Sequence, residues 1–164
     1  MNPTRPSPAE KISIEPYSSD KAKALTDLFY RSVHAIDPKL YSETDKEAWA
    51  PTPSDYWFWA KRLARKQPWL ALIEGRIVGF MELEADGHID CVYVDPDYQG
   101  RGVAKTLMNH ILSIARANGT PSLTVEAAKS AQGFFAQMGF KPLHENRVTR
   151  NGRILINYTM KKRL

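Results

Sequence analysis

The sequence has little of what marks several specialised protein classes. Its single cysteine, Cys91, excludes an internal disulfide framework and any metal site built from several cysteines. No apolar run approaches the roughly 20 residues that span a bilayer, and the polar, proline-rich start MNPTRPSPAEK lacks the apolar region of a secretory signal. We therefore expect a cytoplasmic protein without a membrane segment and without a metal.

A basic stripe with interleaved aromatic residues, typical of nucleic-acid-binding proteins, is absent as well. The net charge is +5 and the isoelectric point is about 9.3, which favours anionic partners in general. Lysine and arginine form only two short clusters, KRLARK at 61–66 and KKRL at 161–164. We expect no nucleic acid partner, and a small molecule that carries a polyphosphate fits the charge equally well.

What the sequence does contain is the composition of a globular protein. Its 164 residues are 43% hydrophobic, enough to bury a core. We expect a disordered lead at residues 1–10 and a single domain over 11–164. Local patterns predict the order strand, two helices, three strands, helix, strand, helix and two strands. This order indicates an α/β fold of the α+β type, with a largely antiparallel sheet and one strand–helix–strand crossover.

The boundaries of these elements follow from caps and turns. The first helix is expected after Ser18 or Ser19, and the second after Ser54 or Asp55, beyond a proline-broken segment. Three strands between 69 and 94 are separated by Glu-Gly and Asp-Gly turns, which predicts an antiparallel meander. The last two strands are expected to join at Asn151-Gly152.

The stretch YVDPDYQGRGVAKTLM, residues 93–108, predicts a strand, a glycine-rich turn and a helix, an arrangement that suits a phosphate. Two familiar phosphate motifs do not fit. The dinucleotide motif needs a third glycine where Lys105 stands, and the P-loop needs glycines where Gln99 and Ala104 stand. An ordinary tight turn is the alternative. The context favours a pyrophosphate at the helix N-terminus, with Arg101 and Lys105 at its rim.

Three segments carry a resemblance to a known family. QGRGVA (99–104) resembles the Q/R-x-x-G-x-G/A motif of the GNAT superfamily of acyl-CoA N-acyltransferases. IDCVYVDPDY resembles the acetyl-CoA strand of that superfamily, and SAQGFFAQMGF resembles its last helix. The resemblance covers residues 11–160, and YSETDKEAWAP with LINYTMKKRL is also similar to a bacterial YafP-like subgroup.

The resemblance implies a mixed, mostly antiparallel sheet of six to seven strands flanked by about four helices. It implies acetyl-CoA as acyl donor, no metal, and a primary amine of a small molecule or a protein as acceptor. The pyrophosphate would lie on the glycine-rich loop, the pantetheine arm along the preceding strand, and the sulfur beside the last helix. The residues that would bind coenzyme A are Val92, Tyr93, Val94, Gln99, Gly100, Arg101, Gly102, Val103, Ala104, Lys105 and Phe135.

An amine acceptor is protonated at neutral pH, so a general base is needed. In histone-acetylating members a glutamate lies eleven residues before the first motif residue, and His88 stands at that position here. By strand parity we expect His88 on the same face of its strand as Val92. A backbone N–H near Val92 would donate to the thioester carbonyl oxygen and stabilise its developing negative charge. Glu82 and Glu84 are rival bases. The alternative to a catalytic role is a polar residue beside the Asp-Gly turn for His88, and an exposed position on a strand for Glu82 and Glu84.

One departure from the family concerns the acid. The tyrosine that many members use to protonate the leaving thiolate is replaced by Phe135. Tyr158, Tyr41 and Cys91 are candidate substitutes, although Cys91 fits a buried small hydrophobe equally well. This departure keeps open an alternative function, a non-catalytic acyl-CoA-binding sensor or regulatory module.

The acceptor pocket is expected from residues 29–59, the variable side of the family fold. An aromatic pocket there would suit an amine with a flat or apolar body, and plain helix packing is the alternative. The sequence is compatible with a homodimer but does not fix the oligomeric state. The aromatic side chains that would line the pocket are Tyr30, His34, Tyr41, Trp49 and Trp57.

Overall fold

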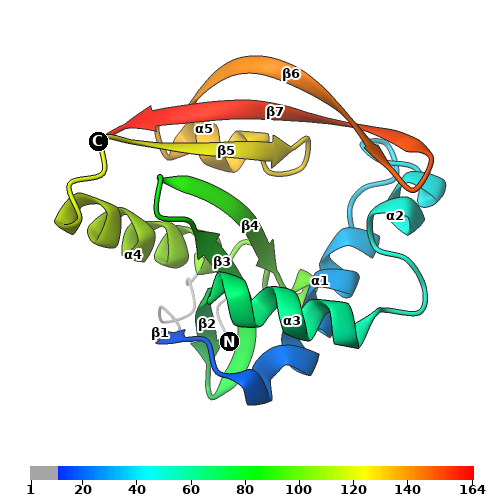
Figure 1. Cartoon of the computed structure of the whole chain (residues 1–164), viewed down its shortest axis with the longest axis horizontal. Coiled ribbons are helices and arrows are strands. Elements are labelled where there is room, and N and C mark those ends of the chain that lie inside the picture. Colours follow the sequence, from blue (N-terminus) through cyan, green and yellow to red (C-terminus); the bar gives the residue numbers. More distant parts are fainter. Residues whose placement is uncertain (1–10) are drawn as a thin grey trace, which may run out of the picture.

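A computed structural model describes residues 11–164, and the expected disordered lead at 1–10 lies outside the described residues. The seven strands of this described part join one sheet (Figure 1). The strands are β1 (Ile12–Pro16), β2 (Trp69–Ile73), β3 (Arg76–Leu83), β4 (His88–Val94), β5 (Ser122–Ala128), β6 (Lys141–Arg150) and β7 (Arg153–Arg163). The helices are α1 (Ala22–His34), α2 (Glu43–Trp49), α3 (Tyr56–Lys66), α4 (Val103–Ala117) and α5 (Gln132–Gln137). The single domain over 11–164 stays a prediction.

The sheet has the order β1-β2-β3-β4-β5-β7-β6. Every neighbouring pair is antiparallel except β4 and β5, which α4 connects as a crossover. The parallel pairing of β4 and β5 covers only His88 with Thr124 and Ile89 with Val125. Beyond Ile89 the two strands diverge, which opens the sheet in its middle. The mostly antiparallel sheet is confirmed.

Two hydrophobic clusters cover the two faces of the sheet. The apolar stripe of α4, with Leu107 and Ile111, packs on one face together with α5. Leu25 of α1 and Leu63 of α3 belong to the cluster on the other face. Neighbouring residues of β2 point into opposite clusters, as the two-residue period of a strand requires. The site therefore lies in a sheet that is fixed from both sides.

Residues 11–164 form five α-helices, one more than expected, because α2 was missed. This helix has only seven residues, too few for a clear apolar period, but a capping box starts it: Ser42 accepts from the Asp45 backbone N–H, and the Asp45 carboxylate accepts from the Ser42 N–H. The expected serine cap of α1 does not form, since a 3₁₀ turn (Ser19–Lys21) precedes that helix. Asp55 does cap α3 by accepting from the Phe58 N–H. Within residues 11–164, no helix combines the length and apolar character that crossing a bilayer demands.

Candidate active site

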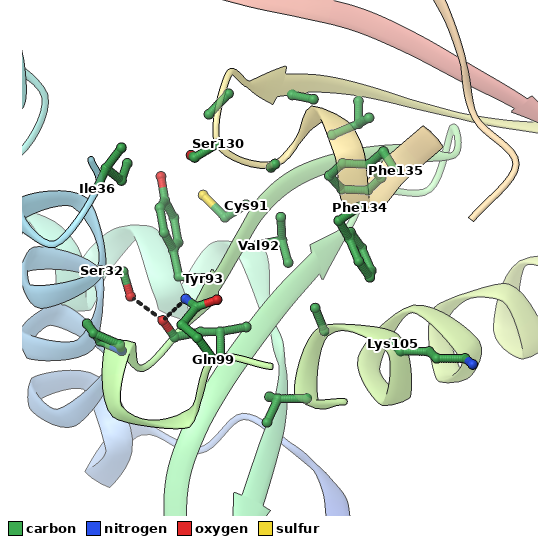
Figure 2. Close-up of a pocket in the computed structure, with 18 of the residues that line it drawn as sticks. Ser32, Ile36, Cys91, Val92, Tyr93, Gln99, Lys105, Ser130, Phe134 and Phe135 are labelled. Carbon is green, nitrogen blue, oxygen red and sulfur yellow. Dashed lines mark hydrogen bonds between the residues drawn. The ribbon is translucent and has the colours of Figure 1, made fainter. Parts of the chain in front are cut away.

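A cavity of about 640 Å³ lies where β4 and β5 diverge. Its walls come from β4, the loop before α4, β5, α5 and the end of α1 (Figure 2). Ten of the eleven residues expected to bind coenzyme A line this cavity. The exception is Arg101, whose guanidinium lies 4.9 Å from the centre of the Tyr98 ring. The tertiary structure thus brings the glycine-rich loop, the β4 backbone and Phe135 around one space.

The loop at one end of the cavity is shaped for an anion. Gly100 and Gly102 have φ of +74° and +83°, a conformation that side chains with a Cβ rarely adopt, and no atom lies within 4 Å of either virtual Cβ. The hydrogen-bond ladder of α4 begins when the Thr106 N–H donates to the Gly102 carbonyl. The N–H groups at 103–105 therefore lack helical acceptors and lie at the positive end of the helix dipole. This cradle fits the pyrophosphate of coenzyme A, and Lys105 lies beside it.

A β-bulge in β4 separates the expected base from Val92. Met81 of β3 pairs with Val92, but Leu83 pairs with Ile89, so β4 carries one extra residue between them. Ile89 accordingly packs in the same cluster as Val92, although their positions differ in parity. The expectation that His88 shares the face of Val92 is therefore wrong. A two-residue period holds only while the register is unbroken.

His88 does not line the cavity but lies directly behind a residue that does. Its Nε2 forms a short hydrogen bond with Glu126 of β5, and its Nδ1 lies 3.2 Å from a Glu84 oxygen. Burial alone would lower the pKa of His88, but the hydrogen bonds to Glu126 and Glu84 outweigh it and raise the pKa above the usual 6.5. Glu126 lines the cavity, and sequence reasoning missed it.

Comparison with known proteins decides the family. The family model of the acetyltransferase (GNAT) domain matches residues 39–162. The chain belongs to the GNAT acetyltransferase family. It is an acetyl-CoA-dependent N-acetyltransferase, as the resemblance predicted.

Individual relatives agree with this GNAT assignment. The chain is 32% identical to YafP, an N-acetyltransferase of Escherichia coli, over 92% of this chain and 95% of YafP. It is 33% identical to the peptidyl-lysine N-acetyltransferase YjaB of Escherichia coli, over 79% of this chain and 82% of YjaB. The crystal structure of a GCN5-related N-acetyltransferase from Rhodopseudomonas palustris is 36% identical and superposes with a TM-score of 0.91, covering 98% of this chain and all of that one.

The two rival bases of this GNAT site are engaged elsewhere. Glu82 is fully buried and binds the Arg62 guanidinium of α3 through both carboxylate oxygens. Burial raises the pKa of Glu82 even beside this cation. The Lys66 ammonium lies 2.8 Å from Glu84 and 2.7 Å from Asp90, so it already supplies the cation for these two carboxylates. Neither Glu82 nor Glu84 lines the cavity.

The candidate acids are placed unequally. Phe135 lines the cavity and is fully buried, whereas Tyr158 on β7 is not one of the residues that line it. The Tyr41 hydroxyl donates to the Ile156 carbonyl and accepts from the Lys129 N–H. Its proton is therefore already used in a structural hydrogen bond. Cys91 does line the cavity, and burial raises the pKa of its thiol well above the usual value.

Tyr93 brings a hydroxyl to the cavity that the sequence analysis did not consider as a proton donor. It was expected to serve through its backbone, yet its side chain also extends into the cavity (Figure 2). Its ring packs edge-to-face with Phe29, with centroids 5.0 Å apart, and at a tilt against Phe80, with centroids 5.6 Å apart. Burial raises the pKa of Tyr93 well above its ordinary value, so the hydroxyl keeps its proton at neutral pH.

The expected aromatic acceptor pocket is mostly wrong. Of its five members only Trp49 lines the cavity. Tyr30 stacks on His34 with ring centres 4.2 Å apart, and its hydroxyl bonds to Thr52. Trp57 is 70% exposed. The wall on this side consists of Trp49 with small or aliphatic residues from the end of α1, namely Ser32, Ala35 and Ile36.

Proposed function

We propose that the protein acetylates the primary amine of a lysine side chain or of a small molecule, and that Glu126 and His88 together accept the amine proton. The observation that carries this proposal is the Glu126–His88 hydrogen bond at the cavity wall. The similarity to YjaB, named a peptidyl-lysine N-acetyltransferase, supports a protein amine as acceptor. A cytoplasmic location and a homodimer remain predictions from the sequence.

The proton transfer follows from the geometry of this pair. An alkylamine with a pKa near ~10 must lose a proton before it can attack a carbonyl. Glu126 faces the cavity and receives the proton, and His88 behind it holds the proton at Nε2. The pair is active only when His88 is neutral. Because its neighbours raise the pKa of His88, activity should rise with pH through a value above 6.5.

The remaining roles belong to the loop and to Tyr93. Acetyl-CoA supplies the thioester whose acetyl group is transferred. The N–H groups of the loop and of the first turn of α4 would bind its pyrophosphate, and Lys105 would add charge there. We assign to Tyr93 the proton-donor role that Phe135 cannot fill, because its hydroxyl is protonated and lies in the cavity.

The test is thiol release from acetyl-CoA with a panel of lysine peptides, lysine derivatives, diamines and aromatic amines. Glu126→Gln should lower turnover by about 10²- to 10⁴-fold without weakening acetyl-CoA binding. Glu84→Gln is the matched control, because it removes the other partner of His88 outside the cavity. It should keep turnover within about a few-fold and move the pH limb downward.

Two outcomes would contradict the proposal. If Glu126→Gln keeps the turnover and pH profile of the parent protein, the base lies elsewhere. If acetyl-CoA binds but no lysine peptide or small amine of the panel releases thiol, the acceptor lies outside the proposed class.

A further inference from the structure

The positive charge of the protein is concentrated in the β6–β7 hairpin. Residues 141–163 contain seven lysine and arginine side chains against the one carboxylate of Glu145, a net +6. Because the whole chain carries +5, the remaining residues carry a net −1. Pairing of the two strands joins the KKRL cluster at 161–164 to four further cations, which stand singly in the sequence and belong to no short cluster. The seven are Lys141, Arg147, Arg150, Arg153, Lys161, Lys162 and Arg163.

Most of these cations have no anionic partner. Within residues 11–164, only Arg153 forms an ion pair, with Asp45 of α2 at 2.9 Å. Arg147 and Arg150 are exposed on β6. Two large apolar side chains of the hairpin are exposed as well, Leu143 at 56% and Ile154 at 57%. The hairpin therefore presents unpaired charge and apolar surface together.

β6 is also an edge strand. It ends the strand order of the sheet, so no described strand pairs with its outer side. Nine of the ten residues of β6 pair with β7, and no other described strand pairs with β6. Such an edge offers a row of backbone donors and acceptors to an added strand.

The hairpin stands next to the acceptor end of the cavity. Its turn contacts α2, where Asn151 donates to the Ala48 carbonyl at 2.7 Å, and the neighbouring Trp49 lines the cavity. Figure 1 shows β6 and β7 extending from beside α5 to α2. On the other side, β7 pairs with β5, which supplies Glu126 to the cavity wall.

We infer that β6 is a docking edge for an acidic, extended polypeptide segment, which adds to the sheet as a further strand and delivers a nearby lysine to the cavity. The delivery of a lysine rests on the proposed function, whereas the docking does not. Acidic side chains on the added strand would face the unpaired cations of β6, and its backbone would satisfy the open edge.

The observations favour this partner over two others. A second copy of the chain would place the cations of β6 opposite themselves, because Lys141, Arg147 and Arg150 outnumber Glu145, and like charges on facing strands repel. Single-stranded nucleic acids stack their bases on exposed aromatic side chains. The hairpin has one Phe, Tyr or Trp residue, the half-buried Tyr158, and so lacks such a stacking surface.

The sheet geometry also fixes a spacing. Neighbouring strands lie about 4.8 Å apart, so an added strand would lie three strands, about 14 Å, from β5. An extended chain advances about 3.3 Å per residue, so the lysine must lie at least about four residues outside the docked segment. A peptide with a spacer of about two residues should bind but remain a poor substrate.

The experiment uses fluorescent peptides in which a lysine and a spacer of about five residues precede a segment with glutamates on both strand faces, because Arg147 and Arg150 lie on opposite faces of β6. Binding is measured by anisotropy without acetyl-CoA, against a peptide with glutamine for glutamate. The double variant Arg147→Glu/Arg150→Glu should weaken binding of the acidic peptide by about tenfold or more. The matched control Arg65→Glu/Arg116→Glu makes the same charge change at exposed positions on α3 and α4, and should leave binding within about twofold.

Strand addition has its own signature. Two peptides are compared, one N-methylated at its odd-numbered residues and one at its even-numbered residues. One of the two should lose binding and the other should keep it, because only every second N–H of the added strand faces β6. The inference would be overturned if the glutamine peptide binds as tightly as the acidic peptide, or if the control variant loses as much affinity as the double variant. It would also be overturned if both methylation phases have the same effect, or if single-stranded RNA displaces the labelled peptide as effectively as unlabelled peptide does. A dimer that dissociates in Arg147→Glu/Arg150→Glu would overturn it as well.

The two proposals fail separately. Turnover with a small lysine derivative, which is too short to reach β6, reports only the proposed function. If the peptide binds as expected and no amine is acetylated, the docking edge stands and the proposed function falls. If small amines are acetylated and acidic peptides have no advantage, the docking edge falls alone.

Discussion

Replacing Gly102 by alanine should weaken acetyl-CoA binding far more than it lowers stability. Gly102 has φ of +83° and precedes α4, and its virtual Cβ meets no atom within 4 Å. A side chain there would clash with nothing in the protein, but it would occupy the space in which a pyrophosphate approaches the backbone. The loss of acetyl-CoA affinity caused by the Cβ can therefore be measured separately from the loss of stability caused by the left-handed backbone conformation.

Gly119 is the matched control. It follows the other end of α4, has φ of +70°, and also meets no atom within 4 Å. Alanine in this left-handed conformation costs roughly 1–2 kcal/mol at either position. For a chain of this size we expect both variants to melt about 2–8 °C below the parent protein. α4 has 15 residues, so Gly119 lies about 23 Å from the loop and should not affect the cofactor.

The expected loss of affinity is the loss of one charge-assisted backbone hydrogen bond or more. Such a bond contributes about 1.5–3 kcal/mol, which corresponds to a Kd about 10- to 140-fold weaker. Isothermal titration calorimetry with acetyl-CoA measures the Kd, and differential scanning calorimetry measures the melting temperature. If folded Gly102→Ala binds acetyl-CoA as well as Gly119→Ala does, the loop is not the pyrophosphate site.

Two further predictions concern side chains around the cavity. Tyr93→Phe should slow turnover and keep the affinity for acetyl-CoA, whereas the turnover of Tyr158→Phe should stay within about a few-fold of the parent protein. The reason is that Tyr93 lines the cavity and Tyr158 does not. Steady-state kinetics measure both rates, and a larger loss in Tyr158→Phe would assign the acid role to Tyr158. Glu82→Gln should cost about 1.5–3 kcal/mol of stability, because Arg62 loses the bidentate carboxylate and, among the described residues, keeps only Asp90 as its anionic partner. Thermal unfolding measures this loss, and disappearance of the pH–rate limb in this variant would instead show that Glu82 is the base.

Much of the cofactor end follows from local sequence. Gly100 and Gly102 predict a tight turn, and the apolar period after Val103 predicts α4, because neighbours along the chain decide both features. The turn at Asn151-Gly152 is equally local, with positive φ at both residues. The short helix α2 was missed because seven residues provide too little periodicity, although its Ser42/Asp45 capping box is visible in the sequence.

The catalytic end depends on tertiary structure. The β4 bulge reverses strand parity between His88 and Val92, and nothing in the local pattern indicates where a register changes. Glu126 becomes the neighbour of His88 only because β5 pairs in parallel with β4, 38 residues away along the chain. Local sequence is sufficient to predict every strand, four of the five described helices and the place where an anion can approach the backbone, since those properties involve adjacent residues. Which side chains share a cavity, and which cations share an edge, was decided by strand order and register, because these contacts join residues that are distant in the sequence.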